Sequence, residues 1–422
     1  MDIIIRQAKL RNKEQLVDIG IKNNLFAEIS EKITATATKE INANGQLMSA
    51  PFIESHIHLD AALSAGFPRY NESGTLGEAI QIANERKAFL TKDDVKESAK
   101  EVIHWLVANG VLAIRAHTDF TPTFTTLEAI LELKEEFSDS IDIQVVAFPQ
   151  DGIFTAKNAS EKLEESIKMG VDLIGGLPQA EVTREDGIRA IKLAFELANK
   201  YNLPIDMHAD ESGDEYSRYT EIIAKYALHY DMKHLITASH TTAMHNYSND
   251  YAASLIGRLK QAEMNVVTNP FSNLTLQNRL DGYPKKRGLT RIDELLDAEV
   301  NISIGNDNIM DPFGPLGKGS MLQAAHILVF AAHMDNSQRI NQLFDMITTN
   351  AAQTLNIENY GIKEGNEANC IILDAKNEKE AIRLTSECLY VISKGKIVSE
   401  TKPAERKVHL GSEPSLVTFK RN

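Results

Sequence analysis

Eight short apolar segments, each followed by a stretch of helical character, fill the middle of this 422-residue chain. Buried parallel strands have this apolar character, and they need a helical crossover from one strand to the next. Eight such units predict an α/β fold, a (β/α)8 barrel of the TIM type, with an open doubly wound sheet as the less favoured alternative. The segments lie at 52–53, 111–114, 141–148, 171–174, 203–207, 235–238, 264–267 and 300–304.

The stretch from Thr183 to Tyr201 shows the helical part of the pattern. Thr183 and Asp186 form a Thr-x-x-Asp capping motif at its start. Apolar residues then recur with helical spacing, which predicts an amphipathic helix. Helices after residue 316, including the apolar run 324–330, are expected to cover the outside of the barrel.

The two ends of the chain have a different sequence pattern, with short β-like runs and turns. Short β-like runs at 3–5 and 16–19 predict a small antiparallel sheet. The runs at 368–373 and 389–392, with a hairpin turn at Lys394-Gly395, could complete the same sheet. We therefore expect residues 1–50 and 357–422 to form one small β-sandwich beside a barrel of residues 51–356.

Charge and composition exclude several classes of partner. A net charge of −14 disfavours binding to the nucleic-acid backbone, and no apolar run reaches the ~18 residues of a membrane span. The N-terminus lacks a secretory pattern, so we expect a cytoplasmic protein. Cys370 and Cys388, the only cysteines, are expected to be buried and unreactive.

His56 and His58 stand two residues apart at the end of the first apolar run. Residues i and i+2 of a strand face the same side, so both imidazoles could reach one point. This pair alone is weak evidence, because two strand histidines also occur without a ligand.

The ends of the other strands carry similar groups. In a (β/α)8 barrel these ends meet at one mouth, where active sites lie. Five of the twelve histidines fall there, which argues against chance placement. The groups are His56 and His58 after strand one, His117 and Asp119 after strand two, Gln150 after strand three, His208 and Glu211 after strand five, His240 after strand six and Asp307 after strand eight.

Four of these residues suit one divalent metal ion. His56, His58 and His208 offer neutral imidazole nitrogens and Asp307 a carboxylate, a ligand set that fits Zn²⁺ or Fe²⁺ and leaves a position for water. Such an ion would turn that water into a nucleophile. The alternative is a set of hydrogen-bonded barrel histidines without metal.

Other polar groups at the mouth have two interpretations each. Glu211 could shuttle a proton or cap a helix, and His240 could orient the water or pack in the barrel wall. Gln150 could bind an amide-like substrate edge or belong to a plain turn. His117 and Asp60 could support the metal ligands or form buried hydrogen bonds.

Segments along the whole chain resemble the amidohydrolase superfamily and, within it, the bacterial cytosine deaminases. The similar segments are 54–60 (Glu-Ser-His-Ile-His-Leu-Asp), 73–76 (Ser-Gly-Thr-Leu), 147–150 (Ala-Phe-Pro-Gln), 183–185 (Thr-Arg-Glu), 238–245 (Ala-Ser-His-Thr-Thr-Ala-Met-His), 283–285 (Tyr-Pro-Lys) and 311–317 (Asp-Pro-Phe-Gly-Pro-Leu-Gly).

This resemblance implies a barrel with a β-sandwich and a single iron or zinc ion. No lysine stands at the end of strand four, 177–179, where relatives with two metals usually have one, and this favours one metal. The roles it implies are metal ligation by His56, His58, His208 and Asp307, proton transfer by Glu211, a place beside the water for His240, and contact with the pyrimidine amide edge for Gln150.

Three positions depart from the cytosine deaminase pattern. Asn306 and Asn308 replace a histidine and an aspartate around Asp307, and Phe313 replaces a tryptophan. The replaced aspartate lies beside the substrate, so Asn308 exchanges a charged acceptor for a neutral group that also donates. We expect Gln150, Asn308 and Phe313 to bind the substrate, and the preferred ring could differ from cytosine.

The sequence thus predicts a metal-dependent hydrolase of C–N bonds in cyclic amidines. Metal-bound hydroxide would release ammonia from a small amino-heterocycle. We expect this substrate to be the only small-molecule partner, and the resemblance allows a homo-oligomer. Cytosine is the first substrate to test, with isocytosine, 5-substituted cytosines, creatinine and amino-triazines as alternatives. A cyclic amide hydrolase and a silent ligand-binding relative are the competing classes.

Overall fold

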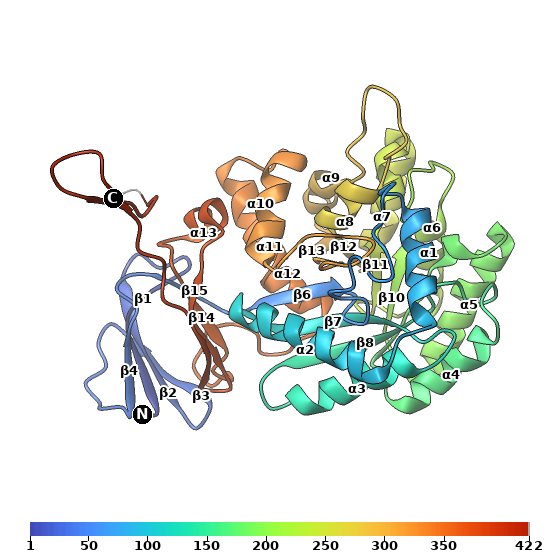
Figure 1. Ribbon diagram of the computed structural model, residues 1–422. Coiled ribbons are helices and arrows are strands. Elements are labelled where there is room, and N and C mark those ends of the chain that lie inside the picture. The colour runs from blue at the N-terminus through green and yellow to red at the C-terminus, as the bar shows by residue number, and fades with distance from the viewer. Residues whose placement is uncertain (421–422) are drawn as a thin grey trace.

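The computed structural model describes residues 1–420, and its centre is a barrel of eight parallel strands (Figure 1). All eight predicted strands are present and pair in chain order, which confirms the predicted fold class. The strands are β6 (Phe52–Ile57), β7 (Val111–Asp119), β8 (Asp142–Phe148), β9 (Leu173–Ile174), β10 (Ile205–Ala209), β11 (Ile236–His240), β12 (Asn265–Thr268) and β13 (Asn301–Ile304).

The barrel closes where the end of β13 meets β6. The backbone N–H of Asp307 donates to His56 O and that of His58 donates to Asp307 O, both at 2.8 Å. Buried Glu54 clasps the same seam, because its carboxylate accepts hydrogen bonds from the backbone and side chain of Asn306. Asn306 therefore acts in closing the barrel, and its departure from the cytosine deaminase pattern does not bear on the substrate cavity.

Helices surround the barrel, as the apolar periodicity predicts. The helix expected at 183–201 runs from Arg184 to Tyr201, and the Thr183 side chain caps it by accepting from the N–H of Asp186. After the last strand, α12 packs against both β13 and β6. The helices are α1 (Leu76–Lys87), α2 (Lys92–Ala108), α3 (Thr125–Phe137), α4 (Ala159–Met169), α5 (Arg184–Tyr201), α6 (Tyr219–His229), α7 (Asn249–Gln261), α8 (Pro270–Leu276), α9 (Ile292–Asp297), α10 (Met321–Ala331), α11 (Ser337–Met346) and α12 (Thr349–Thr354).

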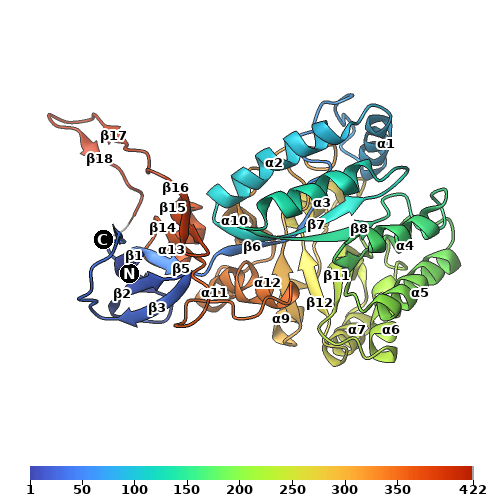
Figure 2. The ribbon, with the colours of Figure 1, turned by 90° about the horizontal axis from the view of Figure 1, so that it is seen from below.

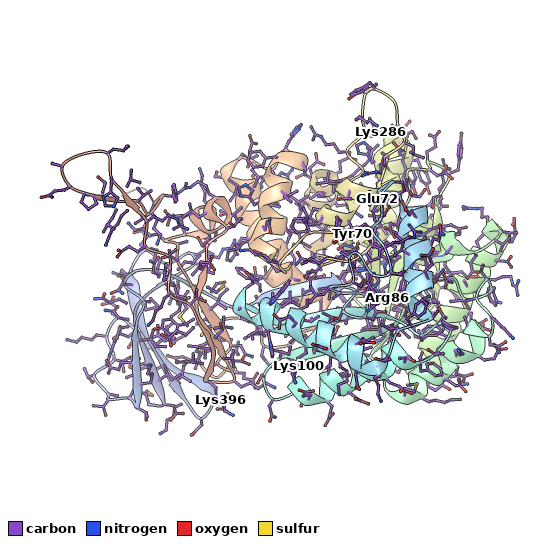
Figure 3. All side chains as sticks on the ribbon, in the orientation of Figure 1. Tyr70, Glu72, Arg86, Lys100, Lys286 and Lys396 are labelled. Atoms are coloured by element: carbon purple, nitrogen blue, oxygen red, sulfur yellow. The ribbon has the colours of Figure 1, made fainter. Side chains whose placement is uncertain are left out.

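One of these helices, α1, was not expected from the strand–helix alternation. It is inserted between β6 and the crossover helix α2, and Figure 3 shows Tyr70 and Glu72 beside it. Its residue Ala79 packs in a small apolar cluster with Leu276 and Phe313. The insertion thus lies over the end of the barrel where the strands terminate.

Both ends of the chain build one eight-stranded sheet beside the barrel (Figure 2). The expected antiparallel arrangement of residues 1–50 is wrong in part, because β4 and β5 run parallel to β1. The segment 31–38 returns the chain to the start of β1, so that β4 runs alongside β1 in the same direction as β1. The strands are β1 (Ile3–Leu10), β2 (Leu16–Lys22), β3 (Leu25–Ser30), β4 (Lys39–Asn42), β5 (Leu47–Ser49), β14 (Cys370–Leu373), β15 (Cys388–Ser393) and β16 (Lys396–Glu400), with helix α13 (Glu378–Leu384) between β14 and β15.

The two parts of this terminal sheet share one apolar core. Side chains of Ile5 and Phe26 from the N-terminal part pack with Ile372 and Ile392 from the C-terminal part. The expected hairpin at Lys394-Gly395 joins β15 to β16. Cys370 and Cys388 are buried free thiols, as predicted, and burial raises both pKa values above the ordinary range.

The chain beyond β16 extends away from the rest of the molecule as an arm (Figures 1 and 2). Two short strands, β17 (Lys407–Val408) and β18 (Ser415–Leu416), pair only with each other. Among residues 1–420, no helix combines the length and the apolar character that crossing a membrane would require.

Candidate active site

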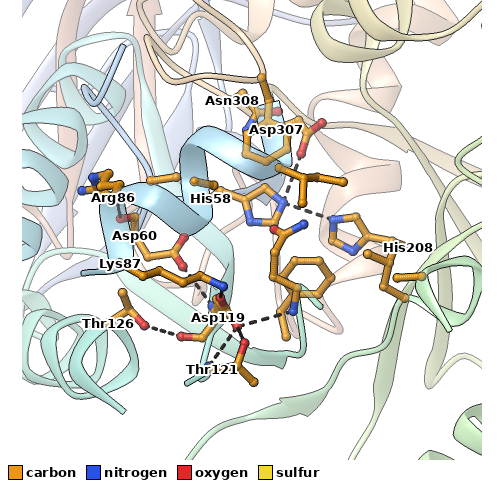
Figure 4. Close-up of a pocket in the computed structure, with 18 of the residues that line it drawn as sticks. His58, Asp60, Arg86, Lys87, Asp119, Thr121, Thr126, His208, Asp307 and Asn308 are labelled. Carbon is orange, nitrogen blue, oxygen red and sulfur yellow. Dashed lines mark hydrogen bonds and ion pairs between the residues drawn. The ribbon is translucent and has the colours of Figure 1, made fainter. Parts of the chain in front are cut away.

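A cavity of about 180 Å³ opens at the ends of the barrel strands, which is enough room for a small heterocycle. Its wall contains Gln150, His208, Glu211 and Asp307 from three different strand ends, together with residues of α1. Figure 4 shows His58, His208 and Asp307 converging on one side, with Lys87 and Asp119 facing them. The predicted mouth of the barrel is therefore a single cavity.

Four buried side chains form the mouth cluster, which we define as His56, His58, His208 and Asp307. The Nε2 atoms of His56 and His58 each lie 3.3 Å from Asp307 Oδ1, and the Nε2 atoms of His58 and His208 are 3.1 Å apart. One ligand atom from each residue lies within 4.8 Å of the others. The groups spread from position 56 to position 307 meet at one point.

The electrostatics of the mouth cluster favour a cation. Burial keeps the pKa of His56 at about 4 and that of His208 well below its ordinary value, so both imidazoles are neutral at pH 7. Burial also opposes ionisation of Asp307, but the neighbouring histidines outweigh it and hold its pKa well below the ordinary range. Burial disfavours the charged form of His58, yet the carboxylate of Asp307 outweighs this and raises its pKa to about 9.

These residues fit a divalent metal ion. The buried His56 Nε2 atom has no hydrogen-bond partner among the described residues, and two imidazole nitrogens face each other across 3.1 Å. Three imidazoles and one carboxylate are the donor set that Zn²⁺ or Fe²⁺ prefers. A cation bound between them would accept the lone pairs of all three imidazoles and the carboxylate.

Glu211 and His240 lie next to the mouth cluster, as their strand-end positions predicted. Glu211 Oε1 is 3.7 Å from His240 Nδ1, and burial raises the pKa of Glu211 to about 8. Burial also lowers the pKa of His240 to about 3, so its ring is neutral. A neutral imidazole beside a carboxyl that is protonated near pH 7 is suited to proton transfer.

Sequence reasoning missed two asparagines that orient His240. The side-chain amide nitrogen of Asn273 lies 2.9 Å from His240 Nδ1, and that of Asn269 lies 3.2 Å from Nε2. A neutral imidazole accepts at only one ring nitrogen, so only one of the two amides can donate to it. Both are buried where β12 passes into α8. The sequence of this segment, Asn269-Pro-Phe-Ser-Asn273, reads as a simple turn, so only the fold reveals the contact.

A chain of hydrogen bonds beneath the site holds His56. Its Nδ1 atom lies 3.0 Å from Ser239 Oγ, which donates to Asp206 at 2.7 Å. His117, predicted as a supporting residue, stacks on His56 with ring centroids 3.8 Å apart. Asp60 instead accepts from the backbone N–H of Asp119 and does not touch the mouth cluster by a hydrogen bond.

Ser239 and Asp206 went unnoticed because they lie inside strands. Asp206 stands two residues before His208, and Ser239 stands one residue before His240. The i, i+2 rule applied to His208 could have pointed to Asp206, since both face the barrel interior.

The three expected substrate-binding residues all line the cavity. The Asn308 amide is already engaged, because its Oδ1 accepts from Ser272 and its Nδ2 donates to Asp311, at 2.8 and 2.7 Å. Its second Nδ2–H is the donor left for a ligand. Phe313 contributes an apolar surface and is nearly buried, and the side chain of Gln150 has no hydrogen-bond partner among the described residues.

The barrel and its mouth cluster define a metal-dependent hydrolase of the TIM-barrel type. Residues 74–399 match the family model described as Amidohydrolase family. The chain belongs to this family and is a hydrolase that acts on C–N bonds. The resemblance to cytosine deaminases that the sequence motifs indicated is thereby confirmed.

The chain is similar to two deaminases and an amidohydrolase. A crystal structure of 5-methylcytosine deaminase from Klebsiella pneumoniae, liganded with 5-fluorocytosine, superposes with a TM-score of 0.92 at 38% identity over 95% of this chain and 98% of that one. The N-isopropylammelide isopropyl amidohydrolase of Pseudomonas sp. (strain ADP) is 31% identical over 94% of this chain and 97% of its own length. A pterin deaminase from Rhizobium rhizogenes is 26% identical over 93% of this chain and 90% of its own.

Proposed function

We propose that this protein hydrolytically deaminates a small aminopyrimidine, cytosine or a 5-substituted cytosine. The observation that carries the proposal is the position of Glu211, which lies 3.7 Å from His240 in the same cavity as the mouth cluster. A pKa of about 8 lets this group give up and regain a proton at neutral pH. The Klebsiella relative supports the choice of ring.

The mouth cluster would hold one Zn²⁺ or Fe²⁺ through His56, His58, His208 and Asp307. When bound there, such an ion lowers the pKa of a water molecule toward neutrality. The protein's own residues then handle protons and position the ring.

Glu211 would carry the proton between water and substrate. As water adds to the ring carbon that bears the amino group, Glu211 would take one proton from the water and pass it to the adjacent ring nitrogen. It would then take the remaining proton of the new hydroxyl group and pass it to the amino nitrogen. The C–N bond breaks, ammonia leaves and a ring carbonyl remains. His240, oriented by Asn269 and Asn273, would hold the attacking water in line and stabilise charge on it.

Gln150 and Asn308 would orient the ring. Gln150 offers a free donor and acceptor to the lactam edge of a pyrimidinone, and Asn308 offers one N–H. Phe313, with Leu276 beside it, supplies an apolar surface that would contact the ring. The roles of these residues rest on position and chemistry.

A panel of rings tests the proposal. The metal-loaded full chain is incubated with cytosine, 5-methylcytosine, isocytosine, creatinine, ammelide and pterin, and free ammonia is measured. We expect the highest kcat/KM for cytosine or 5-methylcytosine. No ammonia from any member would overturn the proposal, and a product with an opened ring would instead indicate a cyclic amide hydrolase.

The Pseudomonas relative favours one second candidate, removal of an alkylamine from an N-substituted amino-triazine. The same chemistry applies, with isopropylamine as the leaving group in place of ammonia. Adding N-isopropylammelide to the panel and measuring both amines separates the two functions.

A further inference from the structure

The cavity wall contains a second glutamine, Gln179, to which the sequence pattern assigned no role. It lies in the 3-10 turn η1 (Pro178–Ala180) that follows β9. Its Oε1 and Nε2 atoms are both buried, and neither has a hydrogen-bond partner among the residues that the structure describes. A buried, unpaired amide costs about 1–3 kcal/mol of stability, so its presence in a cavity wall points to a ligand that pairs with it.

Gln179 lies between two groups already assigned to the substrate. The strands β8, β9 and β10 are neighbours in the barrel, and they lead into Gln150, Gln179 and Glu211 respectively. Gly175 lets β9 approach β8 closely, because a Cβ atom there would lie 2.6 Å from the carbonyl oxygen of Ala147. The two glutamines therefore line adjacent parts of one wall.

A buried carboxylate braces this wall. Glu181, two residues after Gln179, accepts hydrogen bonds from three successive backbone N–H groups, those of Ile153, Phe154 and Thr155, in the loop that follows Gln150. These hydrogen bonds connect the loop that contains Gln179 to the loop that contains Gln150. Both amides are held before a ligand arrives, which reduces the ordering cost of binding.

We propose that Gln179 determines specificity by donating its Nε2–H to the oxygen of a 2-oxo group. This group stands on C2, the ring carbon between the nitrogen that Glu211 protonates and the lactam N–H. This inference rests on the proposed function. With Glu211 at the nitrogen next to the amino-bearing carbon and Gln150 at the lactam edge, the ring atom that faces the strand between them is C2. The substrate class is then 4-amino-2-oxo rings, in preference to rings with hydrogen or an amino group at position 2.

The first test measures binding and needs no turnover. The metal-loaded full chain is titrated calorimetrically with 2-pyrimidinone and with pyrimidine, which differ only in the 2-oxo group and its lactam proton. We expect wild type to bind 2-pyrimidinone about tenfold or more tightly, and Gln179→Leu to lose most of that preference. Equal affinities in wild type, or an unchanged preference in the variant, would overturn the proposal even if the protein deaminates nothing.

A second test separates specificity from structure. For Gln179→Leu we expect kcat/KM on cytosine to fall about 10–100-fold, mainly through KM, while the value on 4-aminopyrimidine, which lacks the 2-oxo group, stays unchanged. Equal losses on both rings would contradict the proposal. Gln353→Leu, at an exposed glutamine on α12 outside the cavity, is the matched control and should change neither value.

Stability provides a third readout. Because Gln179→Leu removes two unpaired buried atoms, its free energy of unfolding without ligand should equal or exceed that of wild type. A clear loss would indicate a structural role for Gln179. Failure of the proposed function looks different, because wild type would then release no ammonia although the binding preference remains.

Discussion

Two buried polar clusters lie in the interior of the same barrel, and they differ in how well their atoms are paired. The barrel floor, which we define as Arg115, Gln144, Asp206, Thr237 and Thr354, is fully connected. Arg115 donates from all three of its guanidinium nitrogens to the other four residues, at 2.7–3.1 Å. In the mouth cluster, by contrast, His56 Nε2 and His208 Nδ1 are buried without a hydrogen bond among the described residues.

This contrast separates structure from function. A fully paired buried network stabilises one arrangement of the strands, since each group would be costly to leave alone. Unpaired buried groups lower stability, and they persist where a ligand completes them. The floor is therefore complete as it stands. At the mouth, His56 Nε2, His208 Nδ1 and the Gln179 amide have no hydrogen-bond partner among the described residues, and a cation and a substrate would supply partners.

The largest effect is expected at the mouth. Replacing Glu211 with Gln keeps the shape but removes the transferable proton, so kcat should fall about 10³-fold while the metal content stays at the wild-type value. Steady-state ammonia release and elemental analysis measure the two quantities. Glu215→Gln, at an exposed site four residues away, is the control. Turnover near the wild-type rate would remove the shuttle role from Glu211.

Substitutions in the barrel floor should lower the free energy of unfolding. Arg115→Met leaves Asp206 buried without its cation, and we expect a loss of about 3–5 kcal/mol in the free energy of unfolding, measured by urea titration. Arg258→Met, on α7 in a half-exposed ion pair with Glu221 of α6, should cost at most about 1 kcal/mol. Similar losses for both variants would show that the floor is not the structural network we describe.

Ser239 joins the two clusters and should show an intermediate effect. Ser239→Ala breaks the link from Asp206 to His56 Nδ1, and we expect metal affinity to fall about 10–100-fold. Competition with a fluorescent chelator measures this affinity. An unchanged metal affinity would show that Asp206 does not orient His56.

The smallest effect is expected in the terminal sheet, where Asp18 is another paired carboxylate. Burial acts to raise its pKa, but the Arg6 guanidinium and backbone N–H donors outweigh it and lower the pKa below the ordinary value of 3.8. The pairing therefore stabilises the fold above the unfolded pKa and is lost as pH falls through the folded pKa. Asp18→Asn should cost about 1 kcal/mol at pH 7 and progressively less below pH 3.8.

Urea titrations at pH 7 and at pH 3.5 measure this difference. Asp139→Asn, at an exposed residue, should be neutral at both values. A loss of stability for Asp18→Asn that is larger at pH 3.5 than at pH 7 would contradict a stabilising role for the ionised Asp18 carboxylate.

Much of this architecture is readable from the sequence. Apolar runs and helical periodicity identified all eight barrel strands, because strand burial depends on local composition. The strand-end rule brought together His56, His58, His208 and Asp307, because parallel strands end at one edge.

Other features depend on contacts that no local pattern encodes. The parallel pairing of β4 and β5 with β1 depends on where the chain crosses back, and α1 interrupts the regular alternation. Asn273 reaches His240 only because β12 lies beside β11. Gln179 looks like an ordinary turn residue until its unpaired burial is seen.

Counting metal ions tests the central claim, that the mouth cluster holds one divalent ion. The full chain is stripped with a chelator, reloaded with Zn²⁺ or Fe²⁺ and analysed for metal alongside Asp307→Ala and the control His326→Ala, which alters a histidine on α10. We predict one ion per chain in wild type and in the control, and less than a tenth of that in Asp307→Ala. Full metal content in Asp307→Ala, or two ions per wild-type chain, would contradict this account.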